Sequence, residues 1–245
     1  MTFRRFKSGL FAFAAVLAAV TPAQAESVRV LVAASMSEVI GTLADDYAAR
    51  SPGSEIQAVH AGSGVLARQI QQGVPADLYI SANTAWITWL TDQDLGTQSR
   101  TIASNALVWI GTEPNPALTA RTGSGRIALA DPDAVPAGQY ARESLVHSGD
   151  WSDLEGRLIL ATNVRDALGW VVRGHAPHGI VYATDAIEYP DLQVDRIDSR
   201  SHDPITYEAL VLTPRGAGFA EYLLSDAAQE ILSSYGFLPP PPTSE

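Results

Sequence analysis

The sequence predicts an α/β protein of two lobes, each with a mostly parallel sheet flanked by helices, and two crossing strands as the hinge. Three observations lead to this fold class. The apolar run 28–34 is nearly continuous, as in a strand that is covered on both faces. Strand-like and helical segments then alternate along the chain, which favours parallel pairing. Two further strand-like segments, 107–111 and 206–213, lie where the chain is expected to pass from one lobe to the other.

The first 25 residues have the pattern of a secretory signal peptide. Three basic residues precede an apolar run, 10–20, that is too short to span a bilayer comfortably. A small-x-small triplet follows and predicts cleavage after Ala25. The chain has no cysteine, which excludes disulfides and thiolate metal sites. We therefore expect an exported periplasmic protein that does not insert into the membrane after cleavage.

The charge of the chain excludes several classes of partner. Three of the 16 Lys and Arg residues lie in the signal segment, so residues 26–245 carry 13 against 27 Asp and Glu, a formal net charge of −14. Nucleic acid and anionic membrane surfaces are poor partners for such a chain. A P-loop is excluded because residues 26–245 contain no lysine. Charge alone favours a cationic ligand.

The elements follow one another in a regular order. After the first strand, the first unit is expected to contain a helix at 37–50, a strand at 56–60, a helix after Gly64, a strand at 77–81 and a helix through 86–90. After the strand 107–111, the second unit is expected to contain strands at 126–130 and 158–160, helices after Pro136 and at 164–173, and the segment 179–186. Two helices close the chain.

These elements predict the domain limits. The signal peptide is 1–25, the first lobe is 26–106 together with 206–245, and the second lobe is 107–205.

Three strand ends of the first unit carry residues that suit an anion. They are the segments 34–38, 62–64 and 81–83, and each offers backbone N–H groups at the start of a helix. Ligands of open α/β sheets bind beyond such strand ends. A purely structural role is the alternative, because Ser35 and Glu38 match a capping box. Both interpretations stay open on these residues alone.

Enzymatic chemistry has weaker support. A serine hydrolase using Ser63 or Ser35 remains an alternative, although Gly62-Ser63-Gly64 lacks the G-x-S-x-G spacing of a nucleophile elbow. The histidines show no H-E-x-x-H spacing, and the acidic segment 131–138 lacks the alternating ligands of a calcium loop. We therefore expect a binding protein that is not an enzyme.

A series of motifs in one order resembles the periplasmic molybdate-binding proteins of ABC transporters. The motifs are AAS (33–35), AGSGVLARQI (61–70), GVPADLYISAN (73–83), DPDAVPAGQYARESL (131–145), NVRDAL (163–168), GIVYATDA (179–186) and YGF (235–237). Any one of them alone would be weak, but the set covers essentially the whole chain after the signal segment. The resemblance implies the two-lobed periplasmic-binding-protein fold.

The resemblance also implies the ligand and its site. It implies one tetrahedral oxyanion, molybdate or tungstate, with molybdenum or tungsten present only as that anion and no cofactor. The implied contacts are the hydroxyls of Ser35, Ser63 and Tyr182 and the backbone N–H groups of Ala82 and Val164. The implied partner is a membrane ABC permease, and we expect a monomer. Another tetrahedral oxyanion such as sulfate, and a structural or interaction protein, are the remaining alternatives.

Two residues depart from the family pattern. Glycines flank Ser63 where relatives often carry further serines, and we expect them to let the backbone approach closely. Glu38 adds a carboxylate one turn inside the helix after Ser35. Because a carboxylate aimed at the anion would weaken binding, we expect Glu38 to fold back or face solvent.

Overall fold

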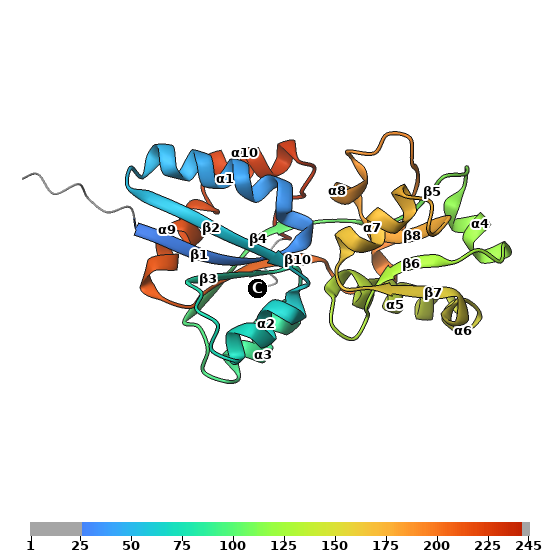
Figure 1. The fold of residues 1–245 in the computed structure, drawn as a ribbon, viewed down its shortest axis with the longest axis horizontal. Helices are drawn as coiled ribbons and strands as arrows, with labels where there is room; N and C mark the ends of the chain where they lie inside the picture. The colour runs from blue at the N-terminus through green and yellow to red at the C-terminus, as the bar shows by residue number, and fades with distance from the viewer. Residues whose placement is uncertain (1–25, 242–245) are drawn as a thin grey trace, which may run out of the picture.

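The computed structural model describes residues 26–241, so the predicted signal peptide and its cleavage site lie outside the described residues. Two five-stranded sheets lie side by side, and each is flanked by helices on both faces (Figure 1). No helix among the described residues is long and apolar enough to cross a membrane.

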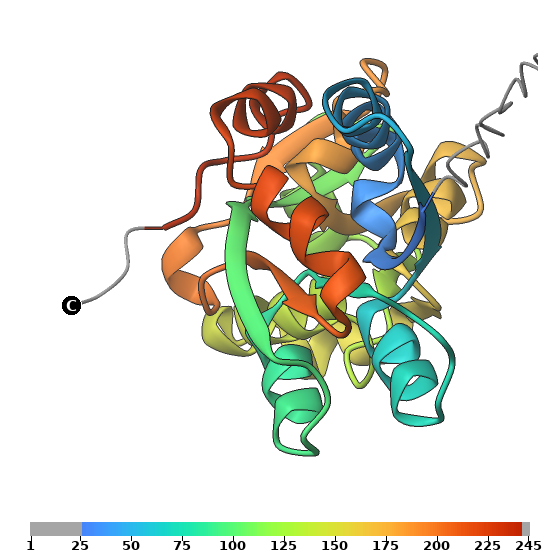
Figure 2. The same cartoon turned by 90° about the vertical axis from the view of Figure 1, so that its left-hand side faces the viewer.

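The first lobe is built from both ends of the described chain. Its strands are β1 (Glu26–Ala33), β2 (Ser54–Ala61), β3 (Leu78–Ser81), β4 (Gln98–Ser104) and β10 (Thr206–Val211); its helices are η1 (Ala34–Met36), α1 (Ser37–Arg50), α2 (Ser63–Gln71), α3 (Thr84–Thr91), η4 (Pro214–Gly216), α9 (Ala217–Tyr222) and α10 (Asp226–Ser234). The sheet order is β2-β1-β3-β10-β4, and only β10 runs against the other four strands. Helices α1 and α10 cover one face, and α2 and α3 cover the other (Figure 2).

The second lobe repeats this arrangement. Its strands are β5 (Leu107–Gly111), β6 (Ile127–Ala130), β7 (Leu158–Ala161), β8 (His178–Tyr182) and β9 (Gln193–Arg196); its helices are α4 (Pro116–Thr122), α5 (Pro136–Ser148), α6 (Trp151–Leu154), η2 (Glu155–Arg157), α7 (Val164–Val172), α8 (Ala183–Ala186) and η3 (Ser199–Ser201). The order is β7-β6-β8-β5-β9, and only β5 runs against the rest. The predicted α/β class with mostly parallel sheets is therefore confirmed.

The chain passes between the lobes twice. Asn105 and Ala106 connect β4 to β5, and residues 202–205 connect η3 to β10. The two strands predicted to cross between the lobes, β5 and β10, do not themselves cross. Each is the first strand after a crossing and belongs wholly to one sheet. Backbone hydrogen bonds of 2.8 and 3.0 Å between Ser104 and Leu238 hold the end of the chain beside the first crossing.

The core explains why the strand ends stay in place. Along β1, Val30 and Val32 pack with the α1 side of the sheet, while Leu31 packs with α2 and α3. All three side chains are at most 1% exposed. Full burial of such a side chain contributes about 1.5–3 kcal/mol. The carboxyl ends of β2, β1 and β3 are therefore fixed side by side between two helical layers.

Strands β4 and β9 are absent from the prediction because most of their residues are polar. β4 alternates exposed and half-buried polar residues over its first half, and β9 is mostly exposed. Neither carries the continuous apolar run that marks a central strand.

Candidate functional site

The five residues predicted to contact an anion lie around one small cavity between the lobes. Ser35, Ser63, Ala82, Val164 and Tyr182 all line it, and each is at most 3% exposed. The cavity is small, with a volume of about 10 Å³. Four lining residues of the second lobe were not predicted as contacts: Val135, Pro136, Ala137 and Asn163.

In the first lobe, the site residues follow three neighbouring strands. Ser35 lies in η1 directly after β1, Ser63 is the first residue of α2 after β2, and Ala82 follows β3. Because β2, β1 and β3 are adjacent and parallel, their carboxyl ends meet at one edge of the sheet. The local order of strand and helix therefore brings these residues together.

The second lobe presents the corresponding edge of its own sheet. Val164 is the first residue of α7, after β7, and Tyr182 is the last residue of β8. Asn163 caps α7, because its side-chain oxygen accepts a hydrogen bond of 3.0 Å from the backbone N–H of Asp166. Val135 and Pro136 form the start of α5 after β6.

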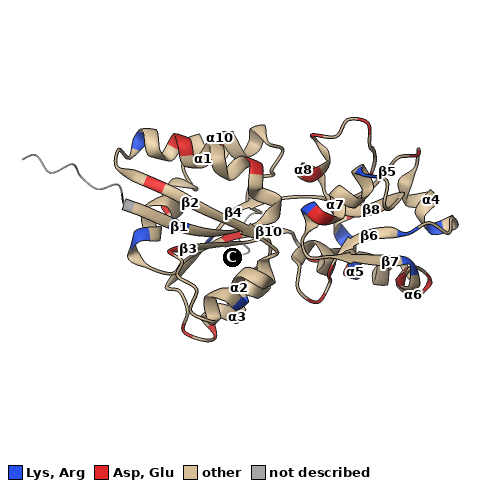
Figure 3. Cartoon of the chain, in the orientation of Figure 1, with Lys and Arg blue, Asp and Glu red and all other residues tan. Residues whose placement is uncertain are grey.

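The cavity has no charged lining among the described residues, but the helix N-termini around it favour an anion. Helices α2, α5 and α7 begin there, and the first N–H groups of a helix have no acceptor within the helix. Charged residues lie mainly on outer helices and loops of both lobes (Figure 3). The site therefore attracts negative charge through dipoles and hydrogen-bond donors.

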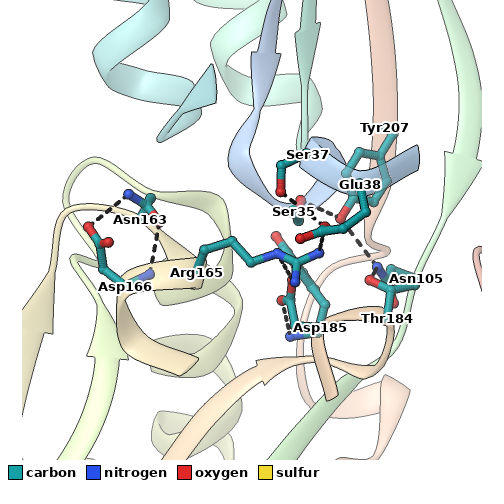
Figure 4. Close-up of polar contacts among 11 residues, drawn as sticks. Ser35, Ser37, Glu38, Asn105, Asn163, Arg165, Asp166, Thr184, Asp185 and Tyr207 are labelled. Carbon is teal, nitrogen blue, oxygen red and sulfur yellow. Dashed lines mark hydrogen bonds and ion pairs between the residues drawn. The ribbon is translucent and has the colours of Figure 1, made fainter. Parts of the chain in front are cut away.

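A chain of hydrogen bonds orients the Ser35 hydroxyl. The Asn105 side-chain oxygen accepts from Ala106 N–H at 2.9 Å, so its amide nitrogen is the donor and bonds the Tyr207 hydroxyl at 3.2 Å. Tyr207 in turn donates to Ser35 Oγ at 2.8 Å (Figure 4). Because Ser35 Oγ accepts, its own proton remains for donation. Neither Asn105 nor Tyr207 was predicted as part of the site.

Ser63 is held in a similar donor state. Its Oγ accepts a hydrogen bond of 3.2 Å from the backbone N–H of Ala82, and its carbonyl accepts one of 2.8 Å from the Tyr79 hydroxyl. The Ser63 proton is thus available to a ligand. The Ala82 N–H points toward Ser63 Oγ in this structure, so its contact with an anion stays a prediction.

Tyr182, which lines the cavity, carries an unpaired donor. Its hydroxyl is buried and has no hydrogen-bond partner among the described residues. Burial raises the pKa of Tyr182 well above its usual value, so the hydroxyl keeps its proton. A buried, unpartnered hydroxyl in a native protein requires an explanation, and a ligand acceptor supplies one.

Gly62 and Gly64 allow the two lobes to meet. A Cβ atom on Gly62 would lie 2.7 Å from the carbonyl oxygen of Thr162, and one on Gly64 would lie 2.3 Å from the carbonyl oxygen of Ala134. Gly64 N–H also donates to Ala134 O at 3.1 Å. The close backbone approach expected at these glycines is therefore an approach to the second lobe.

Glu38 does not take the orientation expected from the sequence. It neither folds back as a capping-box residue nor simply faces solvent, because its carboxylate pairs with Arg165 of the second lobe. Arg165 Nε also lies 2.9 Å from Asp185 Oδ1, at an angle too poor for a hydrogen bond (Figure 4). The opposite charge of Arg165 outweighs the local capping interaction.

Asp185 is expected to make stability depend on pH. Burial raises its pKa from 3.8 to about 7, although Arg165 and the backbone N–H of Tyr182 favour the charged form; Glu38 and Glu188 raise it further. The folded protein thus keeps a proton that the unfolded chain loses above about pH 4, and stability from this group is lost between about pH 4 and about pH 7.

In Asp185→Asn this titration is absent. As the pH rises from about 4 to about 7, the Tm of wild type should therefore fall relative to that of the variant. Above about pH 7 the difference between the two Tm values should stay constant. Parallel pH profiles of the two proteins would contradict the raised pKa.

Comparison with known proteins assigns the family. The family model described as bacterial extracellular solute-binding protein matches residues 28–238. The chain belongs to this family. It is 34% identical over 231 residues to molybdate-binding protein ModA of Haemophilus influenzae, covering 88% of this chain and 91% of that one. It is also 34% identical over 227 residues to ModA of Escherichia coli, covering 86% and 88%.

The solute-binding family also accounts for the architecture. The solved structure of the periplasmic molybdate-binding protein of Azotobacter vinelandii matches with a TM-score of 0.78, at 22% identity, over 87% of this chain and 100% of that chain. At that identity the likeness shows the fold alone. The resemblance and the two-lobed fold predicted from the sequence are confirmed, and the relatives are solute-binding proteins rather than enzymes.

Proposed function

We propose that this protein binds molybdate or tungstate between its lobes and delivers the anion to an ABC permease in the membrane. The observation that carries the proposal is the chemistry of the cavity. Three hydroxyl-bearing residues, Ser35, Ser63 and Tyr182, line it together with helix starts from both lobes, and no charged side chain lines it among the described residues. The relatives named for molybdate binding support the choice of anion.

Short-range donors can hold a dianion in an acidic protein. Hydrogen bonds to charged groups contribute about 1.5–3 kcal/mol each, and several donors act together here. Most acidic side chains among the described residues are at least partly exposed, where salt and water screen their charge; Asp77, Asp185 and Glu208 are the buried ones. The acidic composition therefore does not oppose binding of an anion, and the cationic ligand that charge alone favours is not proposed.

The donors predict discrimination against phosphate. Near neutral pH phosphate carries at least one proton, and the protonated oxygen needs a hydrogen-bond acceptor. Among the described residues, no carboxylate lines the cavity to accept that proton. The unmet donor should weaken binding by about 1–3 kcal/mol, or roughly 5- to 150-fold. Side-by-side titrations with molybdate and phosphate test this, and equal affinities would contradict it.

Sulfate is the alternative ligand of the same class. It is also a fully deprotonated tetrahedral dianion, but it is smaller than molybdate. Isothermal titration calorimetry with molybdate, tungstate, sulfate and phosphate is the test of the proposed function. We expect one site per chain that favours molybdate and tungstate. Tighter binding of sulfate would assign the protein to another oxyanion, and no binding of any of the four would reject the proposal.

We propose that the lobes close around the anion. The moving bodies are 26–106 with 206–245, and 107–205, with the crossings at 105–106 and 202–205 as the hinge. Contacts between the lobes support this: Asn83 Nδ2 donates to Gln139 Oε1 at 2.6 Å, and the Tyr140 hydroxyl donates to the carbonyl of Ala82 at 3.3 Å. An anion that contacts both lobes stabilises the closed state.

The remaining parts of the proposal concern location and assembly. We place the protein in the periplasm as a monomer after cleavage of the signal peptide behind Ala25, which the exact mass and the elution volume of the exported protein would test. A hydrolase is disfavoured because Ser35 Oγ and Ser63 Oγ bond Tyr207 and Ala82, and neither bonds a histidine among the described residues. A panel of ester and amide substrates should give no turnover.

A further inference from the structure

An ion pair connects the two lobes beside the cavity. The guanidinium of Arg165 on α7 contacts the carboxylate of Glu38 on α1, and both side chains are only partly exposed, at 18% and 35%. Of the ion pairs among residues 26–241, this one alone joins the lobes; the others lie within one lobe. Figure 4 shows Arg165 reaching from its own helix toward Glu38.

The second-lobe end of this pair is coupled to both predicted site residues of that lobe. Arg165 directly follows Val164 in the first turn of α7. Asp185, next to Arg165, uses its other carboxylate oxygen to accept the backbone N–H of Tyr182 at 3.1 Å. A force on the guanidinium is therefore transmitted to the backbone positions of Val164 and Tyr182.

The first-lobe end of the pair is also close to the site. Glu38 lies three residues after Ser35, in the first turn of α1, which directly follows η1, and the Ser37 hydroxyl donates to its carboxylate at 3.0 Å. A second cavity of about 200 Å³ borders the pair on its outer side, and Ser35 lines both cavities. The pair thus stands at the edge of the site where the lobes meet.

We propose that Glu38 and Arg165 form a latch that holds the lobes closed over the bound anion, with Arg165 as a positioning residue that does not itself contact the ligand. The proposal rests on the proposed function, because it requires an anion between the lobes. When the lobes separate, Arg165 keeps Asp185 and loses Glu38. The latch therefore acts after capture and slows release.

The direction in which Glu38→Gln changes anion binding distinguishes this proposal from simple electrostatics. Glu38→Gln removes a negative charge near a dianion and frees positive charge on Arg165, so Coulomb attraction alone would tighten binding. A latch gives the opposite result. We expect the dissociation rate of tungstate to rise about five- to tenfold, with the association rate changed less than about twofold. The effect should shrink at high salt, because screening weakens the pair in wild type.

Glu188→Gln is the matched control. Glu188 lines the same outer cavity, is exposed and has no ion-pair partner among the described residues. Its replacement removes the same charge from the same neighbourhood without touching the latch, so release should be unchanged or slower. Stopped-flow fluorescence of the tryptophans would measure both rates in wild type and both variants, and melting of the ligand-free proteins would detect a merely structural role.

The outcomes are distinct. Faster release from Glu38→Gln alone, with an unchanged ligand-free Tm, supports the latch. Release equal to that of Glu188→Gln, tighter binding, or a large loss of ligand-free stability overturns it. If wild type does not bind tungstate, the proposed function fails. The latch, which requires a bound anion, fails with it, whereas tungstate binding by wild type with unchanged release from Glu38→Gln overturns the latch alone.

Discussion

Replacing Gly62 with alanine is expected to weaken binding of tungstate by about 10- to 100-fold while leaving the ligand-free protein as stable as wild type. The added Cβ would lie 2.7 Å from the carbonyl oxygen of Thr162 and 3.1 Å from a methyl of Val135, and both belong to the second lobe. The backbone of Gly62 itself, at φ −60° and ψ 137°, is open to alanine. The clash therefore exists only when the lobes are closed.

Gly41→Ala is the control for this prediction. Gly41 lies in α1, and a Cβ there meets no atom within 4 Å. This variant should keep wild-type affinity and gain about 0.5–1 kcal/mol in the free energy of unfolding. Calorimetry for affinity and thermal melting for stability measure both effects. Wild-type affinity in Gly62→Ala would mean that the lobes do not approach this closely around the ligand.

The second large effect is expected for Tyr182→Phe. A hydroxyl that donates to a dianion contributes about 1.5–3 kcal/mol, so its loss should weaken binding by roughly 10- to 150-fold. The ligand-free protein should be at least as stable as wild type, because the hydroxyl has no partner to lose among the described residues. Affinity and ligand-free stability therefore change in opposite directions.

Tyr207→Phe separates a ligand contact from a structural hydroxyl. The Tyr207 ring lies 6.0 Å from that of Tyr182, but its hydroxyl donates to Ser35 and accepts from Asn105. This variant should lower the ligand-free stability by about 1 kcal/mol, with a smaller loss of affinity. Wild-type affinity in Tyr182→Phe, or a ligand-free Tm several degrees lower, would remove Tyr182 from the proposed contacts.

Much of the site could be predicted because it follows local rules. Ser35, Ser63 and Ala82 each lie within two residues of the end of a strand, and parallel neighbours end at one edge of a sheet. The five individual contacts all came from the resemblance to the molybdate-binding proteins, and for Val164 and Tyr182 the resemblance was the only basis. Sequence patterns therefore predicted the strand ends of the first lobe, and the family motifs predicted the residues of the second lobe that lie opposite them.

The contacts between residues far apart in the sequence could not be predicted in this way. Tyr207 meets Ser35 across 172 positions of the chain, and Glu38 meets Arg165 across 127. The local pattern around Glu38 predicted a capping box, but a guanidinium brought close by the fold is the stronger partner. At Gly62 the expected close approach is present, although a second-lobe carbonyl makes it. The tertiary packing, and not the local sequence, determines which group lies against Glu38 and Gly62.

The most direct measurement is the position of tungsten in a crystal of the protein grown with tungstate, located by its anomalous scattering. We expect one strong peak per chain in the cavity between the lobes, within hydrogen-bonding distance of the Ser35, Ser63 and Tyr182 hydroxyls for the anion's oxygens. The two lobes should be in contact at Gly62. A peak bound by one lobe alone, a peak outside this cavity, or an empty cavity at saturating tungstate would contradict the proposed site.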